Sequence, residues 1–291
     1  MKRLPARFLY TGRAREAYKA LGSSAGYSPL RSNAAARVAR AHLSDARSWL
    51  LLGAGPDPVV ETRVLAETRA TLDRGPSGSR LVVAHDVDEC GSAHAAERLL
   101  AESASIGPAE IRYVSGDLLA PEGECAGRVF DVATLLGYTW GNVRGSVRAA
   151  ALGPMGIRAK RLLLDVAIAN SDRDPRVHST IGKLEMEWYR AAIEEWAIET
   201  GETWRSMGGS SGYDGPIVQR AVGSIGGGYR IDVVATGLDL ALISFSRKSL
   251  PDWIGEIEAG GAGWEVDAVE VTRDEAPLAR AVILASSKHW R

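Results

Sequence analysis

The stretch WLLLGAG, residues 49–55, decides the fold class, because it joins a short apolar run to a pair of glycines. Four consecutive apolar residues, Trp49 to Leu52, leave no polar side, which is typical of a strand buried on both faces of a parallel sheet. Gly53 and Gly55 then predict a tight turn. The stretch therefore indicates a buried strand whose carboxyl end opens into a glycine turn.

Comparable units lie on both sides of this strand. Upstream, residues 33–50 are rich in Ala and Arg and favour a helix. Downstream, apolar runs typical of strands alternate with segments of helical spacing. Strands are expected over 79–89, 110–121, 128–136 and 159–170, and helices over 59–74 and 92–104. This alternation predicts βαβ units with right-handed crossovers, and hence a doubly wound α/β sheet.

The pattern changes in residues 176–246, which we expect to form an inserted α+β segment. Residues 183–197 predict a helix with one apolar face that packs on a core. That face carries Leu184, Trp188, Ala192 and Trp196. Residues 206–228 are rich in Gly and Ser and predict a loop.

The last part of the chain predicts more strands. Residues 229–237 and 239–249 flank a glycine turn and favour an antiparallel hairpin. Residues 250–287 then indicate a helix, a strand, an acidic loop and a final strand. The loop between these last two strands is too short for a parallel crossover, so they are expected to pair antiparallel.

Five parallel strands followed by an antiparallel hairpin resemble the Rossmann-like sheet of the class I S-adenosylmethionine-dependent methyltransferases. On this resemblance, residues 1–175 and 247–291 form a domain that binds S-adenosyl-L-methionine. Residues 1–32 would be a segment that caps the substrate, and 176–246 an inserted substrate-binding domain.

Composition excludes several other classes of protein. Among 291 residues, 35 Lys and Arg against 36 Asp and Glu leave a net charge of -1, with no basic excess for nucleic acid. No apolar run approaches the about 20 residues that span a bilayer, and the first residues lack a signal sequence. Two cysteines, Cys90 and Cys125, favour a reducing cytoplasm. The scattered histidines do not predict a metal site.

The glycine turn allows more than one ligand. A dinucleotide fingerprint requires GxGxxG, and Pro58 stands where its third glycine is needed. This disfavours a nicotinamide-dependent dehydrogenase. A methyltransferase needs only the first tight turn, because the amino-acid end of its cofactor lies there and no pyrophosphate has to be cradled. The turn is also compatible with a plain strand–helix connection.

Acids follow at the ends of the next two strands. Asp86 ends the run that begins at 79, and its carboxylate can accept hydrogen bonds from both ribose hydroxyls. Asp117 follows Gly116 at the next strand, where it can accept from an adenine amino group. Each acid alone is compatible with a solvated loop, but the pair favours an adenosine site.

The chain resembles the histidine-specific methyltransferases of the ergothioneine pathway, which trimethylate an amino-acid α-nitrogen. Residues 4–32 resemble the family's FYD.RGSELF…YYPTR segment, and VVETRVL, 59–65, its KTR.LL. VVAHDVDE and VSGDLL resemble its ribose and adenine acids, and LLGYTWGNV, 135–143, its FLGSTIGNF. The similarity covers residues 4–175 and, more faintly, 240–291.

The resemblance implies a set of site residues. The residues implied for cofactor binding are Gly53, Gly55, Arg63, Asp86, Asp117, Gly137, Tyr138 and Thr139. Those implied for the catalytic pocket are Asn142, Tyr27 and Tyr10, with Asn142 hydrogen-bonded to the amino acid and the small Gly141 letting the backbone approach. Tyr138 and Trp140 are expected where aromatic rings could attract the positive sulfur.

Substrate recognition departs from the family. Its Glu-x-Ser pair aligns with Ser244 and Ser246, which together with Tyr27 and Asn142 are the expected substrate-binding residues. The loss of the carboxylate removes a group suited to imidazole, so an acceptor other than histidine is expected. A further family tyrosine, expected near position 180, has no clear counterpart.

The sequence thus predicts a methyltransferase, expected to methylate nitrogen, that acts on a small amino-acid-like amine or on a specialised-metabolite intermediate by in-line displacement. An amine can lose its proton before it reaches the site, so no dedicated base is required. The alternative is a protein that binds the cofactor or an intermediate without methylating it, as a partner subunit or as a catalyst of another displacement. A protein partner or a homodimer stays open.

Overall fold

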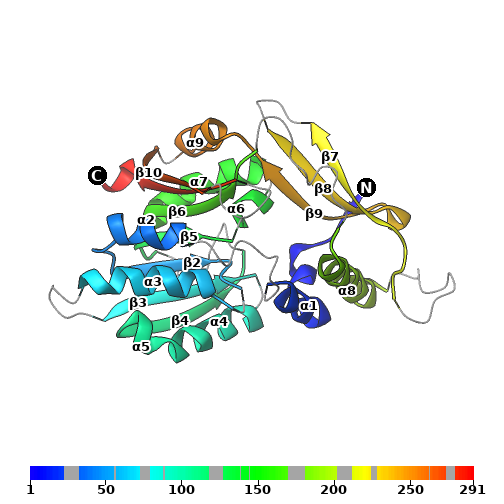
Figure 1. The fold of residues 1–291 in the computed structure, drawn as a ribbon, viewed down its shortest axis with the longest axis horizontal. Helices are drawn as coiled ribbons and strands as arrows, with labels where there is room; N and C mark the ends of the chain where they lie inside the picture. The colour runs from blue at the N-terminus through cyan, green and yellow to red at the C-terminus, as the bar shows by residue number, and fades with distance from the viewer. Residues whose placement is uncertain are drawn as a thin grey trace.

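The computed structural model describes residues 1–22, 33–55, 57–72, 79–87, 89–117, 127–137, 139–143, 145–169, 181–201, 212–223, 228–261, 263–272 and 279–291. Two sheets stand side by side in these ranges, and the large sheet with its helices makes up the bulk of the molecule (Figure 1). Tyr27 and Tyr138 lie outside the described residues.

The large sheet has seven strands in the described part of the chain. Their order is β10 (Trp264–Thr272), β11 (Arg280–Ser287), β6 (Ala159–Ala167), β5 (Phe130–Leu135), β2 (Ser48–Leu52), β3 (Arg80–Asp86) and β4 (Ala109–Ser115). The strands from β6 to β4 run parallel, while β11 is antiparallel to both β6 and β10. The predicted fold class, five parallel strands with a terminal antiparallel hairpin, is confirmed.

Helices cover both faces of this sheet (Figure 1). One face packs on α2 (Ala34–His42), α3 (Val59–Leu72), α4 (Glu89–Ala101) and α5 (Ser103–Ile106). The other packs on α6 (Thr139–Asn142), α7 (Gly145–Arg158) and α9 (Leu250–Glu258). In β2, Trp49 and Leu51 enter the first core while Leu50 and Leu52 enter the second, as the uninterrupted apolar run requires.

The small sheet has the order β1 (Lys2–Arg3), β9 (Leu240–Arg247), β8 (Tyr229–Ala235) and β7 (Ile217–Gly223). A third core lies between this sheet and α8 (Lys183–Thr200), α1 (Gly12–Gly22) and the 3-10 turn η1 (Ala6–Leu9). Trp188, Ala192 and Trp196 are buried there, so the predicted apolar face of the helix is confirmed. Short 3-10 turns η6 (Thr236–Leu238) and η7 (Lys288–Trp290) complete the elements.

The first residues of the chain pack with the small sheet. β1 pairs in parallel with β9, α1 lies along α8, and the Trp188 indole donates to the carbonyl of Leu9. Burial of Phe8 and Leu9 in the third core fixes this arrangement. The domain boundaries stay a prediction, but residues 1–22 share a core with the insertion, whereas they were expected with residues 33–175.

Two local predictions were wrong. The helix expected over 33–50 ends at His42, because Leu43 and Ala46 turn into the core and the chain must enter β2 at Ser48. The loop expected over 206–228 contains β7, which pairs with β8 over its whole length. β7 is an edge strand with exposed Arg220 and Ala221, so its sequence lacks the alternation that identifies a half-buried strand.

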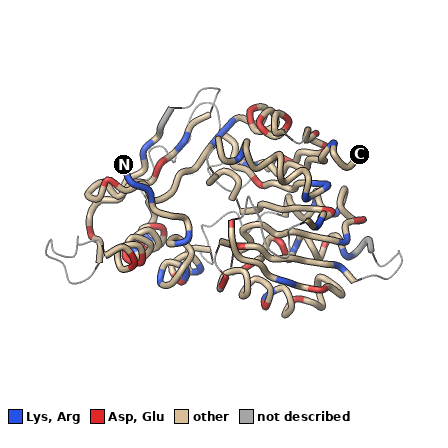
Figure 2. Tube along the Cα trace, turned by 180° about the vertical axis from the view of Figure 1, so that it is seen from behind, with Lys and Arg blue, Asp and Glu red and all other residues tan. Residues whose placement is uncertain are grey.

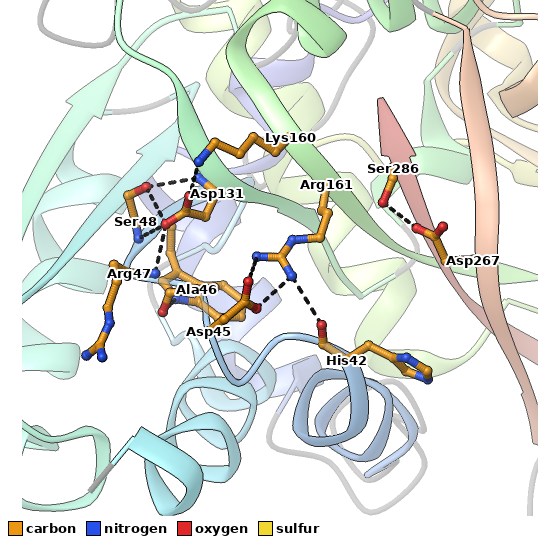
Figure 3. A network of polar contacts seen from close by, with 11 residues as sticks. His42, Asp45, Ala46, Arg47, Ser48, Asp131, Lys160, Arg161, Asp267 and Ser286 are labelled. Carbon is orange, nitrogen blue, oxygen red and sulfur yellow. Dashed lines mark hydrogen bonds and ion pairs between the residues drawn. The ribbon is translucent and has the colours of Figure 1, made fainter. Parts of the chain in front are cut away.

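Polar contacts lock the amino ends of the central strands (Figure 3). Asp131 of β5 accepts from the backbone N–H groups of Arg47 and Ser48, at 2.9 and 3.1 Å, and from Lys160 at 2.8 Å. Burial opposes its ionisation, but Lys160 and these backbone donors hold the pKa of Asp131 below its ordinary value. This network positions β2, β5 and β6 at the edge opposite their carboxyl ends.

Positions of Lys and Arg alternate with positions of Asp and Glu along the chain trace (Figure 2). This distribution accords with the formal net charge of -1. Of the helices in the described ranges, none combines the length and apolar character that a membrane crossing requires.

Candidate functional site

A cavity of about 400 Å³ opens at the carboxyl ends of the central parallel strands. Its walls come from the strand ends of the large sheet, from β9 of the small sheet and from the N-terminal segment. Open parallel sheets bind ligands at this edge. The predicted residues that line the cavity are Gly53, Gly55, Asp86, Gly137, Thr139, Asn142, Tyr10 and Ser244.

The glycine turn after β2 depends on left-handed backbone. Gly53 has φ 66° and Gly55 has φ 64°, a region that side chains with a Cβ rarely adopt. The N–H of Gly53 donates to the His85 carbonyl at 2.8 Å, which ties the turn to the end of β3. The turn thereby presents its backbone to the cavity without a side chain in the way.

Asp86 ends β3 and is 7% exposed. Its Oδ2 accepts from the N–H of Gly55 at 2.9 Å, and its Oδ1 accepts from the N–H of Val87 at 2.7 Å. A carboxylate oxygen has two lone pairs and can accept more than one hydrogen bond. The carboxylate is thus held rigidly with acceptor capacity at the cavity, which suits a pair of neighbouring hydroxyls.

The segment after β5 supplies the next part of the wall. Gly137 has φ 67°, and its N–H donates to the buried carboxylate of Asp165. Thr139 turns its hydroxyl back to the Leu136 carbonyl at 2.8 Å. The side-chain oxygen of Asn142 is buried and has no hydrogen-bond partner among the described residues. A buried amide oxygen without a partner is costly, so this acceptor suits a ligand donor.

Sequence reasoning missed Glu61 as a site residue. Glu61 lies in the first turn of α3, lines the cavity and is only 5% exposed. Burial first, then the charges of Asp165, Asp57 and Asp86, raise its pKa to about 8, against the opposing effect of its own backbone N–H. The segment VVETRVL carried no signal for this, because burial of one glutamate in a helix depends on tertiary packing.

The N-terminal segment contributes an aromatic wall. Tyr10 lines the cavity as predicted, and Tyr18, which sequence reasoning missed, lines it as well. The two rings meet edge to face with centroids 5.2 Å apart, and each lies within 6 Å of the Trp188 ring, at 5.9 and 5.0 Å. This packing gives the cavity an aromatic surface on α1 and η1.

Other predicted residues lie elsewhere. Arg63 and the exposed Asp117 are absent from the cavity wall among the described residues. Ser246 also lies off the wall and accepts a hydrogen bond from Arg148 at 3.2 Å. The structure therefore does not bring Ser244 and Ser246 together on the cavity.

One expectation for the segment after β5 was wrong. Trp140 is fully buried in the core with α7 and α9, so its ring does not face the cavity. Gly141 packs against β9, where a Cβ would lie 3.3 Å from the Ser246 carbonyl oxygen. Within α6, the Trp140 side chain points into the core and Asn142 lies on the cavity wall. Which residue faces which side depends on where the helix begins.

Comparison with known proteins adds to this geometry. No family model matches the sequence, and no curated protein sequence matches it. Among solved structures, the chain is similar to Burkholderia thailandensis 1,6-didemethyltoxoflavin-N1-methyltransferase, with bound 1,6-didemethyltoxoflavin and S-adenosylhomocysteine. The identity is 15%, the match covers 94% of this chain and 83% of the other, and the TM-score is 0.50.

Two further structures show weaker similarity. Streptomyces venezuelae DesVI is 14% identical over 96% of this chain and 100% of its own, with a TM-score of 0.46. Human N-acetylserotonin methyltransferase, in complex with S-adenosylmethionine, is 12% identical over 96% of this chain and 57% of its own, with a TM-score of 0.48. Similarity to the toxoflavin enzyme, with the strand order described above, shows the Rossmann-like fold of class I methyltransferases.

Proposed function

We propose that the protein is an S-adenosylmethionine-dependent methyltransferase that acts on a small molecule carrying an amine. One observation carries this proposal: a single cavity unites the glycine turn, the Asp86 carboxylate and the unsatisfied amide oxygen of Asn142. The bound S-adenosylhomocysteine of the toxoflavin enzyme, whose fold this chain shares, supports the choice of cofactor.

The described residues fit this cofactor. Asp86 is fixed by the N–H groups of Gly55 and Val87 and retains acceptor capacity for the ribose hydroxyls. The turn at Gly53 and Gly55 leaves room for the amino-acid end. Asp117 and Arg63 stay proposed cofactor contacts on the strength of the family resemblance alone, as does Tyr138.

The chain's own residues orient the acceptor and exclude water. S-adenosylmethionine, when bound, supplies a methyl group on a positively charged sulfur. The Asn142 oxygen can accept a hydrogen bond from the acceptor's N–H, which aims the nitrogen lone pair away from Asn142. Tyr10 and Tyr18 cover this side of the cavity and limit access of water to the reacting atoms.

The acceptor class follows from the wall opposite the glycine turn. Ser244 lies there with Tyr10 and Tyr18, without a carboxylate from β9 to match a cationic side chain. We therefore propose an amine without a cationic side chain, such as an amino-acid-like intermediate, as the methyl acceptor. The resemblance to the histidine-specific methyltransferases rests on the sequence segments quoted above, and histidine is not the proposed substrate.

Binding and turnover test the proposal separately. Calorimetry should detect binding of S-adenosylhomocysteine, and incubation with labelled cofactor and a panel of amines should yield products heavier by one methyl. Absence of S-adenosylhomocysteine binding contradicts the proposal. Binding without transfer to any amine would favour the alternative of a cofactor-binding protein that does not methylate.

Asn142→Ala should lower kcat/KM by at least about tenfold, since it removes a hydrogen bond worth about 1 kcal/mol and an orienting contact. Affinity for S-adenosylhomocysteine and the melting temperature should stay close to wild type, because the Asn142 oxygen has no partner among the described residues. Steady-state kinetics and calorimetry measure the two effects. Asn33→Ala, at the exposed start of α2, is the matched control, and unchanged turnover in Asn142→Ala would remove Asn142 from the pocket.

A further inference from the structure

Glu61 is a buried carboxyl group on the wall of a cavity. It is 5% exposed, and within the described part of the chain its carboxyl hydrogen-bonds only to its own backbone N–H. Asp57, Asp86 and Asp165 contribute negative charge around it. A buried carboxylate without a cationic partner is strongly unfavourable, so the ionised form of Glu61 requires a positively charged group, which a ligand can supply.

The position of Glu61 narrows the choice of cation. It lies in the first turn of α3, directly after the glycine turn at Gly53 and Gly55, and it shares the cavity wall with that turn. In the proposed function this turn holds the amino-acid end of the cofactor. That end carries an ammonium group with three N–H donors, which a carboxylate can accept.

We propose that Glu61 binds the α-ammonium group of S-adenosylmethionine and so selects cofactors that carry a free amine. This inference rests on the proposed function and adds a residue and a ligand group to it. The charge-assisted hydrogen bonds replace the water that burial excludes from the carboxylate. The α3 N-terminus contributes a weaker attraction to the same carboxylate.

Binding of the ammonium group is then coupled to the release of a proton from Glu61. With a pKa of about 8, Glu61 is protonated at pH 7 in the free protein, and it loses that proton when the ammonium group binds. Affinity for ammonium ligands therefore falls as the pH drops below about 8, by up to about tenfold per pH unit. Among the described residues, the other charged groups on the cavity wall are Asp57, Asp86, Arg3 and Lys19. Asp165, which pairs with Arg280, adds negative charge near Glu61.

Calorimetry with two ligands tests the assignment. S-adenosylhomocysteine carries the ammonium group, and an analogue with hydrogen in place of its α-amino group does not. Glu61→Gln keeps the shape of the side chain and should weaken the affinity for S-adenosylhomocysteine by about 10- to 100-fold. Its affinity for the deaminated analogue should stay unchanged. Wild type should release close to one proton per S-adenosylhomocysteine at pH 7, measured in buffers of different ionisation enthalpy, and Glu61→Gln should release none.

Glu67→Gln, on an exposed position of the same helix, is the matched control and should behave as wild type. Equal loss of affinity for both ligands in Glu61→Gln, or no loss for either, overturns the ammonium assignment alone. Failure of wild type to bind either ligand overturns the proposed function together with the assignment. A melting temperature at or above wild type shows that Glu61→Gln is folded.

Discussion

Asp165→Asn is expected to lower the free energy of unfolding by about 3–5 kcal/mol, because it removes the buried negative charge that pairs with the Arg280 guanidinium. Asp165 is fully buried on β6, and Arg280 on β11 is 7% exposed. The Nε of Arg280 donates to Asp165 at 3.2 Å, and its Nη2 donates to the second oxygen. Burial raises the pKa of Asp165, while Arg280 and the Gly137 N–H oppose that rise. Urea denaturation measures the loss.

Two companion variants give this prediction a control. Asp165→Leu combined with Arg280→Met removes both charges and should recover most of the stability, as apolar replacements of buried ion pairs often do. Asp45→Ala removes the exposed partner of Arg161 and should cost under about 1 kcal/mol (Figure 3). A single Asp165→Asn variant as stable as Asp45→Ala would contradict the expected role of the buried pair.

Asp86→Ala should weaken binding of S-adenosylhomocysteine by about 1.5–3 kcal/mol, or roughly 10- to 150-fold in Kd. The variant removes the carboxylate that is proposed to accept from the ribose hydroxyls. It also frees the N–H groups of Gly55 and Val87, which loosens the glycine turn. Calorimetry with S-adenosylhomocysteine measures the change.

Asp131→Ala is the matched control for Asp86→Ala. Asp131 also accepts from two backbone N–H groups, but at the amino ends of the strands (Figure 3). Its loss should reduce stability and leave Kd unchanged. If Asp86→Ala binds S-adenosylhomocysteine as tightly as Asp131→Ala, then Asp86 does not hold the cofactor.

The large sheet was predictable because its strands carry their own signal. An apolar run such as Trp49 to Leu52 fits only a strand that is covered on both faces, and the glycines after it mark the carboxyl end. Successive ends then gather Gly53, Asp86 and Asn142 at one edge, as the topology requires. The small sheet was less predictable, since β7 is an exposed edge strand and β1 has two residues.

The details of the cavity depend on packing that no local pattern records. Trp140 and Asn142 are two residues apart, yet α6 directs one into the core and the other to the cavity. The sequence pattern does not distinguish Glu61 from an exposed glutamate of a helix, because its burial depends on how α3 packs on the sheet. Tyr18 becomes part of the wall only because α1 packs on α8. These placements are long-range, which is why composition and spacing did not find them.

The end of β9 determines how the two sheets are joined. Beyond its last residue, Lys248 forms a bridge with Ile168 and accepts from the Ala169 N–H at 2.9 Å, so the two sheets are fastened at this margin. Arg148 adds to this connection, because it donates to the Ser246 hydroxyl on β9 and to the Glu256 carboxylate on α9. α1 lies beside α8, below the small sheet in this view (Figure 1). The cavity wall that β9 supplies is therefore anchored to the large sheet through the Ile168–Lys248 bridge.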